Sequence, residues 1–331
     1  MTVKQIVLAS RPDGAPGLQQ FRTEEIELPA LKEGEVLLRP LYVSVDPYMR
    51  GRMRDVESYI PPFQVDKPLE GGVVAIVEES RFAALKPGDK VSGMLPWATK
   101  FIAEGSKLQP IGDVDVPDSY NLGILGTTGY TAYFGVVDIL KPQPGQTIVI
   151  SGAAGAVGVI AGQIAKLHGA RIIGIAGSDE KNELLKKEFG FDEVINYNTE
   201  DIPAALARTC PDGIDGYLDN VGGDITDAVV ARMNMQGKIA LIGQIALYNA
   251  KEEPKGPRIL YPILMKGLLV QGFLIRQHYS RWPEARQAIA KMISEGKLKS
   301  KETIVEGFDE LPNAFLGLFK GSNIGKMIVK I

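Results

Sequence analysis

The stretch SGAAGAVG at residues 151–158 decides how the fold of this chain is interpreted. It follows an apolar run, QTIVI at 146–150, and leads into a helix-period segment at 155–168. A glycine-rich turn between a buried strand and a helix can receive a dinucleotide diphosphate at the helix N-terminus, but it can equally be a tight structural turn. In the pattern G-x-G-x-x-G the matching residues are Ala153, Gly155 and Gly158, so the first glycine is replaced. The strand–turn–helix context favours a dinucleotide site.

Downstream of this loop, apolar strands alternate with helical segments. We expect strands at 146–150, 171–177, 193–196, 216–220, 237–243 and 268–273, and helices at 155–168, 179–189, 201–209, 224–234 and 281–295. Such alternation predicts an open parallel sheet with helices on both faces. Upstream, the runs at 35–45, 71–79 and 89–95 are short and broken by Pro and Gly, which is typical of a small, mostly β, barrel-like domain. The predicted fold class is therefore α/β with two domains.

The end of the second strand indicates which dinucleotide is bound. Enzymes that use NAD normally place Asp or Glu there to bind the ribose hydroxyls. This strand ends in IAGSDEK, with Gly177 and Ser178 at its tip, and Asp179 is placed to open the next helix. A hydroxyl and the ammonium of Lys181 suit a 2′-phosphate, although Lys181 alone could be an ordinary solvated lysine. The pattern predicts NADPH/NADP⁺ as the cofactor.

Composition excludes several classes of partner. The 331 residues carry a net charge of −3 without a long basic run, so we expect no binding to nucleic acid or to an anionic membrane. No apolar stretch approaches the roughly 20 residues that span a bilayer, and the N-terminus lacks a secretion signal pattern, so we expect a cytoplasmic protein. The single cysteine, Cys210, and the two histidines, His168 and His278, leave too few ligands for a zinc site.

Motifs spread along the chain resemble one family. They are SVDPYMRG at 44–51, LGTTGYTAYFG at 125–135, SGAAGAVG at 151–158, GSDEK at 177–181, NYNT at 196–199, LDNVGG at 218–223 and GSNIGKMIVK at 321–330. Together they resemble the medium-chain dehydrogenases/reductases, in particular the zinc-independent leukotriene B4 12-hydroxydehydrogenase/prostaglandin reductase family with the bacterial curcumin reductases and the alkenal reductases. Where zinc alcohol dehydrogenases carry GHE, this chain has PLEGGVV at 68–74, without the histidine. No metal site is expected.

The resemblance implies a GroES-like domain at 1–122 with 308–331, a Rossmann NADPH-binding domain at 123–307, and an active-site cleft between them. It also implies positions for the cofactor: the diphosphate over the loop, Lys181 and Tyr197 at the adenosine phosphate, and the nicotinamide beside 273–275. The expected cofactor residues are Gly155, Ala156, Val157, Gly158, Ser178, Lys181, Tyr197, Asn220, Ile242, Gly243, Tyr248, Phe273, Leu274, Ile275 and Asn323. The segment RQHYSRWPE at 276–284 departs from the family pattern.

Without a metal, NADPH and hydrogen-bond donors must carry the reaction. Hydride addition to the β-carbon of an α,β-unsaturated ketone or aldehyde fits, because the charge that develops on the carbonyl oxygen needs only a donor. Tyr261 aligns with a family tyrosine placed near the substrate or the nicotinamide ribose and is the expected catalytic residue, with the ribose hydroxyl as the alternative donor. Tyr48 is a second candidate and more typical of a turn. A quinone reductase and a non-catalytic NADPH-binding protein remain alternatives. The resemblance also implies a homodimer, paired through the apolar segment at 267–275 if that segment is an edge strand and not a central one.

Overall fold

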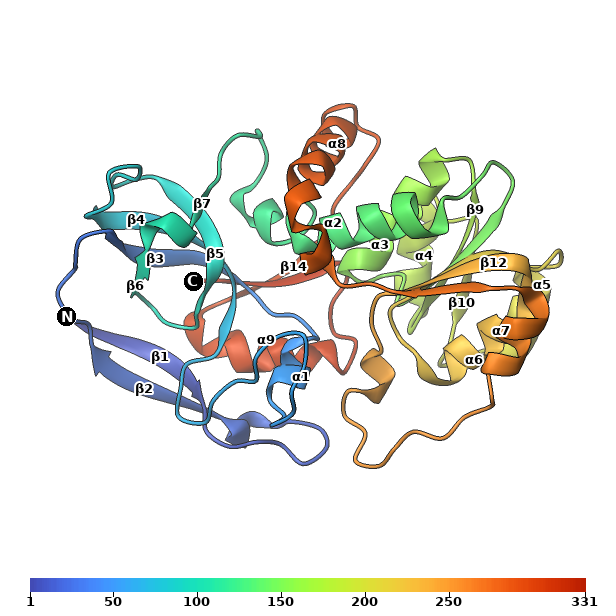
Figure 1. The fold of residues 1–331 in the computed structure, drawn as a ribbon, viewed down its shortest axis with the longest axis horizontal. Coiled ribbons are helices and arrows are strands. Elements are labelled where there is room, and N and C mark those ends of the chain that lie inside the picture. The colour runs from blue at the N-terminus through green and yellow to red at the C-terminus, as the bar shows by residue number, and fades with distance from the viewer. The chain divides into compact units, whose positions relative to one another are not determined.

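The computed structural model describes residues 1–331 and divides into two compact units (Figure 1). The first unit comprises Met1–Leu122, Glu302–Asn323 and Met327–Ile331, and the second comprises Gly123–Lys301 and Ile324–Lys326. The C-terminal return to the first unit begins at Glu302, ahead of residue 308, because a strand at Glu302–Glu306 joins the sheet of that unit. The predicted two-domain α/β class is confirmed.

The first unit is built on two antiparallel sheets. A two-stranded sheet pairs β1 (Thr2–Leu8) with β2 (Phe21–Glu27). A seven-stranded sheet has the order β14-β15-β3-β4-β5-β7, and β6 pairs with β3. Its strands are β3 (Glu35–Ser44), β4 (Glu70–Ser80), β5 (Lys90–Pro96), β6 (Phe101–Glu104), β7 (Gln109–Pro110), β14 (Glu302–Glu306) and β15 (Lys326–Lys330).

Aromatic side chains fill the centre of the first unit. Trp97 stacks on Phe21, and Phe315 of α9 (Leu311–Leu318) meets both rings edge-on. A short helix, α1 (Met49–Arg52), follows β3 and buries Met49 in the same core. Pro40 lies inside β3 at a shift of register with β4, which is where a strand tolerates a residue without an amide hydrogen. The C-terminal helix thus completes the N-terminal core.

The second unit contains a six-stranded parallel sheet with the order β10-β9-β8-β11-β12-β13. The strand order reverses between β8 and β11, which is the doubly wound arrangement. Every residue of β8 is buried, as expected for a central parallel strand covered on both faces. The strands are β8 (Thr147–Ser151), β9 (Arg171–Ala176), β10 (Glu193–Asn196), β11 (Ile214–Asp219), β12 (Met233–Leu241) and β13 (Leu269–Gly272).

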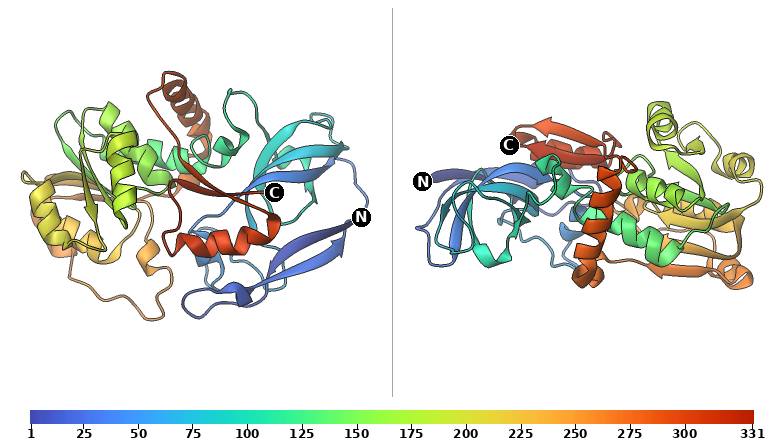
Figure 2. Two further views of the ribbon diagram at one scale, coloured as in Figure 1. Left: turned by 180° about the vertical axis from the view of Figure 1, so that it is seen from behind. Right: turned by 90° about the horizontal axis from the view of Figure 1, so that it is seen from above.

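Helices cover both faces of this sheet, as Figures 1 and 2 show. The helices of this unit are α2 (Thr127–Phe134), α3 (Ala156–Leu167), α4 (Asp179–Phe189), α5 (Ile202–Thr209), α6 (Gly223–Arg232), α7 (Leu260–Lys266) and α8 (Trp282–Ser294), of which α8 packs on α2 and not on the sheet. The predicted helix at 224–234 ends earlier, at Arg232, because β12 already begins at Met233. No helix combines the length and the apolar character that crossing a membrane requires.

Candidate functional site

The loop between β8 and α3 turns on Gly152. Its φ of 59° lies in the left-handed region that favours glycine, and the amide of Gly155 closes the turn on the Gly152 carbonyl at 2.9 Å. Ala153, which occupies the expected first-glycine position, is fully buried instead. Gly152 therefore makes the turn that the fingerprint assigns to its first glycine.

The start of α3 presents unbonded amides. The first helical hydrogen bond runs from the amide of Val159 to the Gly155 carbonyl, so the amides of Ala156, Val157 and Gly158 have no acceptor in the helix. A Cβ on Gly158 would lie 2.5 Å from the Gly152 carbonyl oxygen, so only glycine lets the helix approach the loop this closely. Three amides at a helix N-terminus form an anion site suited to a diphosphate.

The C-terminal segment is bonded to this loop. The amide of Gly325 donates to the Ala154 carbonyl at 2.7 Å, and Gly325 forms an isolated parallel bridge with Gly155. Gly325 has a φ of 67°, and a Cβ there would lie 2.0 Å from the Lys301 carbonyl oxygen. Asn323, an expected cofactor residue, stands two positions earlier in the chain. Sequence reasoning did not assign a role to Gly325, although it lies in the motif at 321–330.

At the corner after β9, Gly177 and Ser178 follow the strand directly, without Asp or Glu at these two positions. Ser178 is the N-cap of α4, and its hydroxyl accepts from the Lys181 amide at 3.3 Å. Asp179 is the first residue of α4, as the sequence predicted. Its carboxylate accepts a hydrogen bond from the side-chain amide of Asn196 at 2.7 Å. The Lys181 side chain is half-buried, and burial lowers its pKa. The arrangement suits a phosphate and disfavours a bare ribose diol.

Tyr197 lies at the same corner. A Cβ on Gly177 would be 2.6 Å from the Tyr197 hydroxyl, so the Tyr197 ring lies directly against Gly177. The Asn198 side chain donates to the Gly177 carbonyl at 2.7 Å and ties the loop after β10 to the loop after β9. The structure thus brings the predicted residues Ser178, Lys181 and Tyr197 to one place.

The loops after β11 and β12 also meet. The Asn220 amide and side chain bind Ser151, at 3.0 Å to its hydroxyl and 2.7 Å to its carbonyl oxygen. The amides of Ile242 and Gly243 both donate to the Asp219 carbonyl, at 2.8 and 3.0 Å. A Cβ on Gly243 would lie 3.1 Å from the Asn220 carbonyl oxygen, so these loops pack backbone to backbone. Asn220, Ile242 and Gly243 therefore gather at the carboxyl ends of the central strands.

The predicted nicotinamide segment continues directly from β13. The Phe273 amide donates to the Leu241 carbonyl at 3.0 Å, and the Phe273 side chain is buried. Its ring packs 4.8 Å from that of His278, which also stacks on Phe134. Leu274 and Ile275 are half-buried. The divergent segment at 276–284 thus packs against Phe273 through His278, for which the sequence predicted no role.

The two tyrosine candidates differ in surroundings. Tyr261 lies on α7 with 68% of its surface exposed, and its hydroxyl makes no hydrogen bond in the structure. Tyr48 precedes α1 in the first unit and is half-buried against the core, and its hydroxyl contacts the Met94 sulfur at 4.0 Å. Burial, followed by the charge of Asp46, raises the pKa of Tyr48 well above its usual value. The Tyr48 phenol therefore stays neutral and retains its donor at pH 7.

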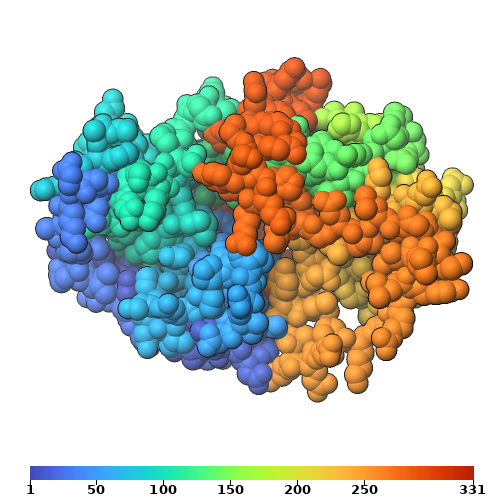
Figure 3. All heavy atoms as spheres, in the orientation of Figure 1, coloured from blue at the N-terminus to red at the C-terminus, as the bar shows by residue number.

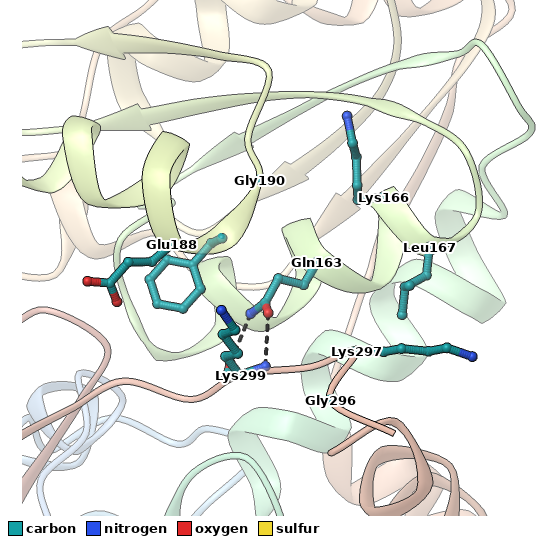
Figure 4. Close-up of a pocket in the computed structure, with 9 residues that line it drawn as sticks. Gln163, Lys166, Leu167, Glu188, Gly190, Gly296, Lys297 and Lys299 are labelled. Carbon is teal, nitrogen blue, oxygen red and sulfur yellow. Dashed lines mark hydrogen bonds between the residues drawn. The ribbon is translucent and has the colours of Figure 1, made fainter. Parts of the chain in front are cut away.

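Two other features lie outside this constellation. The pocket in Figure 4 is at the far end of α3 from the phosphate loop, where Gln163 binds the backbone of Lys299 through both of its amide atoms, each at 2.9 Å. It contains none of the predicted cofactor residues. No group of three or more His, Cys, Asp or Glu side chains could hold a metal ion.

Two family models match the chain. Residues 4–111 match the N-terminal domain of oxidoreductase, and residues 156–291 match the zinc-binding dehydrogenase domain. The NADPH-dependent curcumin reductase of Escherichia coli is 41% identical over 98% of this chain and 96% of its own length. The NADP⁺-dependent 2-alkenal reductase of Nicotiana tabacum is 41% identical over 99% of this chain and 97% of its own length.

The crystal structure of CurA from Vibrio vulnificus in complex with NADPH superposes with a TM-score of 0.95. It is 41% identical and covers 99% of this chain and 98% of its own. The fold and the phosphate loop thus define an oxidoreductase of the medium-chain dehydrogenase/reductase class. Within that class, the chain belongs to the zinc-independent family of NADP-dependent curcumin, alkenal and prostaglandin reductases.

Proposed function

We propose that this protein reduces the C=C bond of α,β-unsaturated ketones and aldehydes with NADPH. The observation that carries the proposal is the corner after β9, where Gly177 and Ser178, in place of a carboxylate, follow the strand and Lys181 is half-buried. An acidic residue there would repel a 2′-phosphate, whereas an ammonium binds it. The relatives that share this chain's full length include reductases of alkenals and of curcumin.

The residues of the second unit fit the cofactor. The amides of Ala156, Val157 and Gly158 would hold the diphosphate, and Lys181 would hold the 2′-phosphate. The absence of a Cβ at Gly158 keeps α3 and its amides against the loop. When bound, NADPH supplies a hydride to the β-carbon of the enone.

The protein's own share of the chemistry is a hydrogen-bond donor for the carbonyl oxygen, where negative charge develops. One preorganised donor of this kind is worth about 3–4 kcal/mol. We assign the donor to Tyr261, with Tyr48 and the cofactor's ribose hydroxyl as alternatives. The exposed Tyr261 hydroxyl has no protein acceptor, and the neutral Tyr48 phenol has only a weak sulfur contact. Either phenol is therefore available to a substrate.

The experiment that tests the function is steady-state oxidation of NADPH with two substrates. An enone such as 3-nonen-2-one should support turnover, and benzoquinone should support less. The opposite preference would identify a quinone reductase. Binding of NADPH without oxidation in the presence of either substrate would identify a non-catalytic NADPH-binding protein.

We also propose that the protein is a cytoplasmic homodimer formed through β13. This strand is the outer strand of the six-stranded sheet, so its far edge has no partner in the chain. Leu269 of β13 and Leu260, Leu264 and Met265 of the neighbouring α7 are all exposed. Both elements, coloured orange, are at the surface in Figure 3. Pairing of two such edges would cover these apolar side chains.

A further inference from the structure

Asp219 is a fully buried carboxylate at the carboxyl end of β11. Its Oδ1 accepts from the Ser151 hydroxyl (3.1 Å), the Tyr217 hydroxyl (2.9 Å) and the amides of Val221 and Gly222 (2.9 Å each). Its Oδ2 accepts from the Thr226 hydroxyl (2.7 Å) and from Nε2 of Gln244 (2.9 Å). A buried charge is tolerated only with such a set of partners. Asp219 therefore joins the ends of β8 and β11, the start of α6 and the loop after β12.

The neighbours of Gln244 fix the direction of its side-chain amide. Its Nε2 donates to Asp219 Oδ2 at 2.9 Å and to the Gly243 carbonyl at 3.0 Å. Both partners are acceptors only, so the amide cannot turn over without placing oxygen against oxygen. The remaining atom, Oε1, accepts no hydrogen bond from the protein and lies beside Gly222, where a Cβ would be 2.2 Å away. Gln244 thus presents an unused acceptor in one defined direction.

This acceptor lies where a ligand is expected on physical grounds. Ser151 ends β8, Asp219 ends β11, and Gln244 follows β12, so all three lie at the carboxyl edge of the sheet. The strand order reverses between β8 and β11. In open α/β sheets, ligands bind beyond the carboxyl ends of the strands at that reversal.

We propose that Asp219 is a positioning residue that, through Gln244, presents an amide oxygen to a hydrogen-bond donor on the nicotinamide riboside half of NADPH. That donor is a ribose hydroxyl or the carboxamide nitrogen. The inference rests on the proposed function, because it requires that the chain binds NADPH. Asp219 itself does not touch the cofactor and acts only by setting the direction of Gln244.

Asp219→Asn keeps the shape of the side chain and replaces one of its two acceptor oxygens by an amide group that donates. Two of the donors at Oδ1 are backbone amides that cannot turn, so the oxygen of the substituted side chain must remain there. The new amide group then faces Thr226, whose hydroxyl can rotate to accept, and Gln244, whose Nε2 cannot. Gln244 then has no orientation that satisfies both neighbours, because turning its amide over would set Oε1 against the Gly243 carbonyl oxygen, so its acceptor is no longer held in one direction.

The test measures the NADPH dissociation constant by fluorescence titration, with thermal melts of the cofactor-free proteins recorded alongside. Asp219→Asn should raise the dissociation constant by up to about 10-fold, as expected when one hydrogen bond to the cofactor is lost.

The variant Gln244→Ala separates positioning from general structure, because it leaves every other donor to Asp219 in place. It should raise the dissociation constant, and adding Asp219→Asn to it should change the constant by less than about twofold. With an NADP(H) analogue whose carboxamide is replaced by an acetyl group, loss of the Asp219→Asn effect assigns the donor to the carboxamide, and persistence assigns it to the ribose.

Two results would overturn the inference. One is an unchanged dissociation constant in Gln244→Ala, which stands even if Asp219→Asn fails to fold. The other is an Asp219→Asn effect that persists in the Gln244→Ala background. A wild-type protein that does not bind NADPH would instead contradict the proposed function, so the two failures are distinguishable.

Discussion

Replacing Lys181 by alanine should weaken the binding of NADPH and leave the binding of NADH almost unchanged. The ammonium is half-buried, and burial lowers its pKa, so solvent screens it less than it screens a surface lysine. A charge-assisted hydrogen bond to a phosphate is worth about 1.5–3 kcal/mol, which corresponds to about a 10- to 150-fold rise in the dissociation constant for NADPH. NADH lacks the 2′-phosphate, so its affinity should change by less than about twofold.

Fluorescence titration of the cofactor-free protein with each dinucleotide measures both constants. Lys187→Ala is the matched control, because Lys187 lies on the same helix but is exposed and pairs only with Glu183. A surface ion pair contributes little, so this variant should bind both dinucleotides as the wild type does. Equal losses of NADPH and NADH affinity in Lys181→Ala would refute the assignment of the 2′-phosphate to this corner.

Three further predictions concern catalysis, metal and assembly. Tyr261→Phe should lower the rate constant for enone reduction by up to about 100-fold and leave the NADPH affinity unchanged. Tyr48→Phe is the comparison. Unchanged rate constants in both variants would leave the ribose hydroxyl as the donor. Dialysis against a strong chelator should leave activity intact, whereas a loss restored by zinc would contradict the metal-free chemistry. Light scattering at micromolar concentration should give the mass of a dimer. Leu269→Lys should weaken the dimer, whereas the control Leu18→Lys, at another exposed leucine, should not. A wild-type monomer would contradict the proposed interface.

Much of the second unit followed from local sequence signals. The helix predicted at 179–189 is α4, because Ser178 caps its start and Gly190, with a φ of 71°, ends it. The helix predicted at 155–168 is α3 to within a residue at each end. The predicted glycine-rich turn between β8 and α3 is also present, with Gly152 making the turn in place of Ala153. In each case the deciding residues are neighbours in the chain.

What the sequence did not reveal depends on contacts between distant residues. Asp219 lies within the motif LDNVGG, which does not indicate its hydrogen-bond partners. Two of these partners, Ser151 of β8 and Gln244 after β12, are distant from it in the sequence. Gly325 reaches Ala154 from the far end of the chain. The π-helical segment Gly135–Leu140, which extends α2, carries no local signal either: a Cβ on Gly135 would lie 3.4 Å from Leu218 and Ile242. Tertiary packing decides these features.

The measurement that tests the central claim most directly is the position of the label after reduction of an enone with NADPH that carries deuterium at the transferred position. We expect the saturated ketone with deuterium on the β-carbon, because in the proposed reaction the hydride adds to that carbon and a proton to the α-carbon. An allylic alcohol with deuterium on the carbonyl carbon would show direct carbonyl reduction and would contradict the assignment of this protein as a C=C reductase.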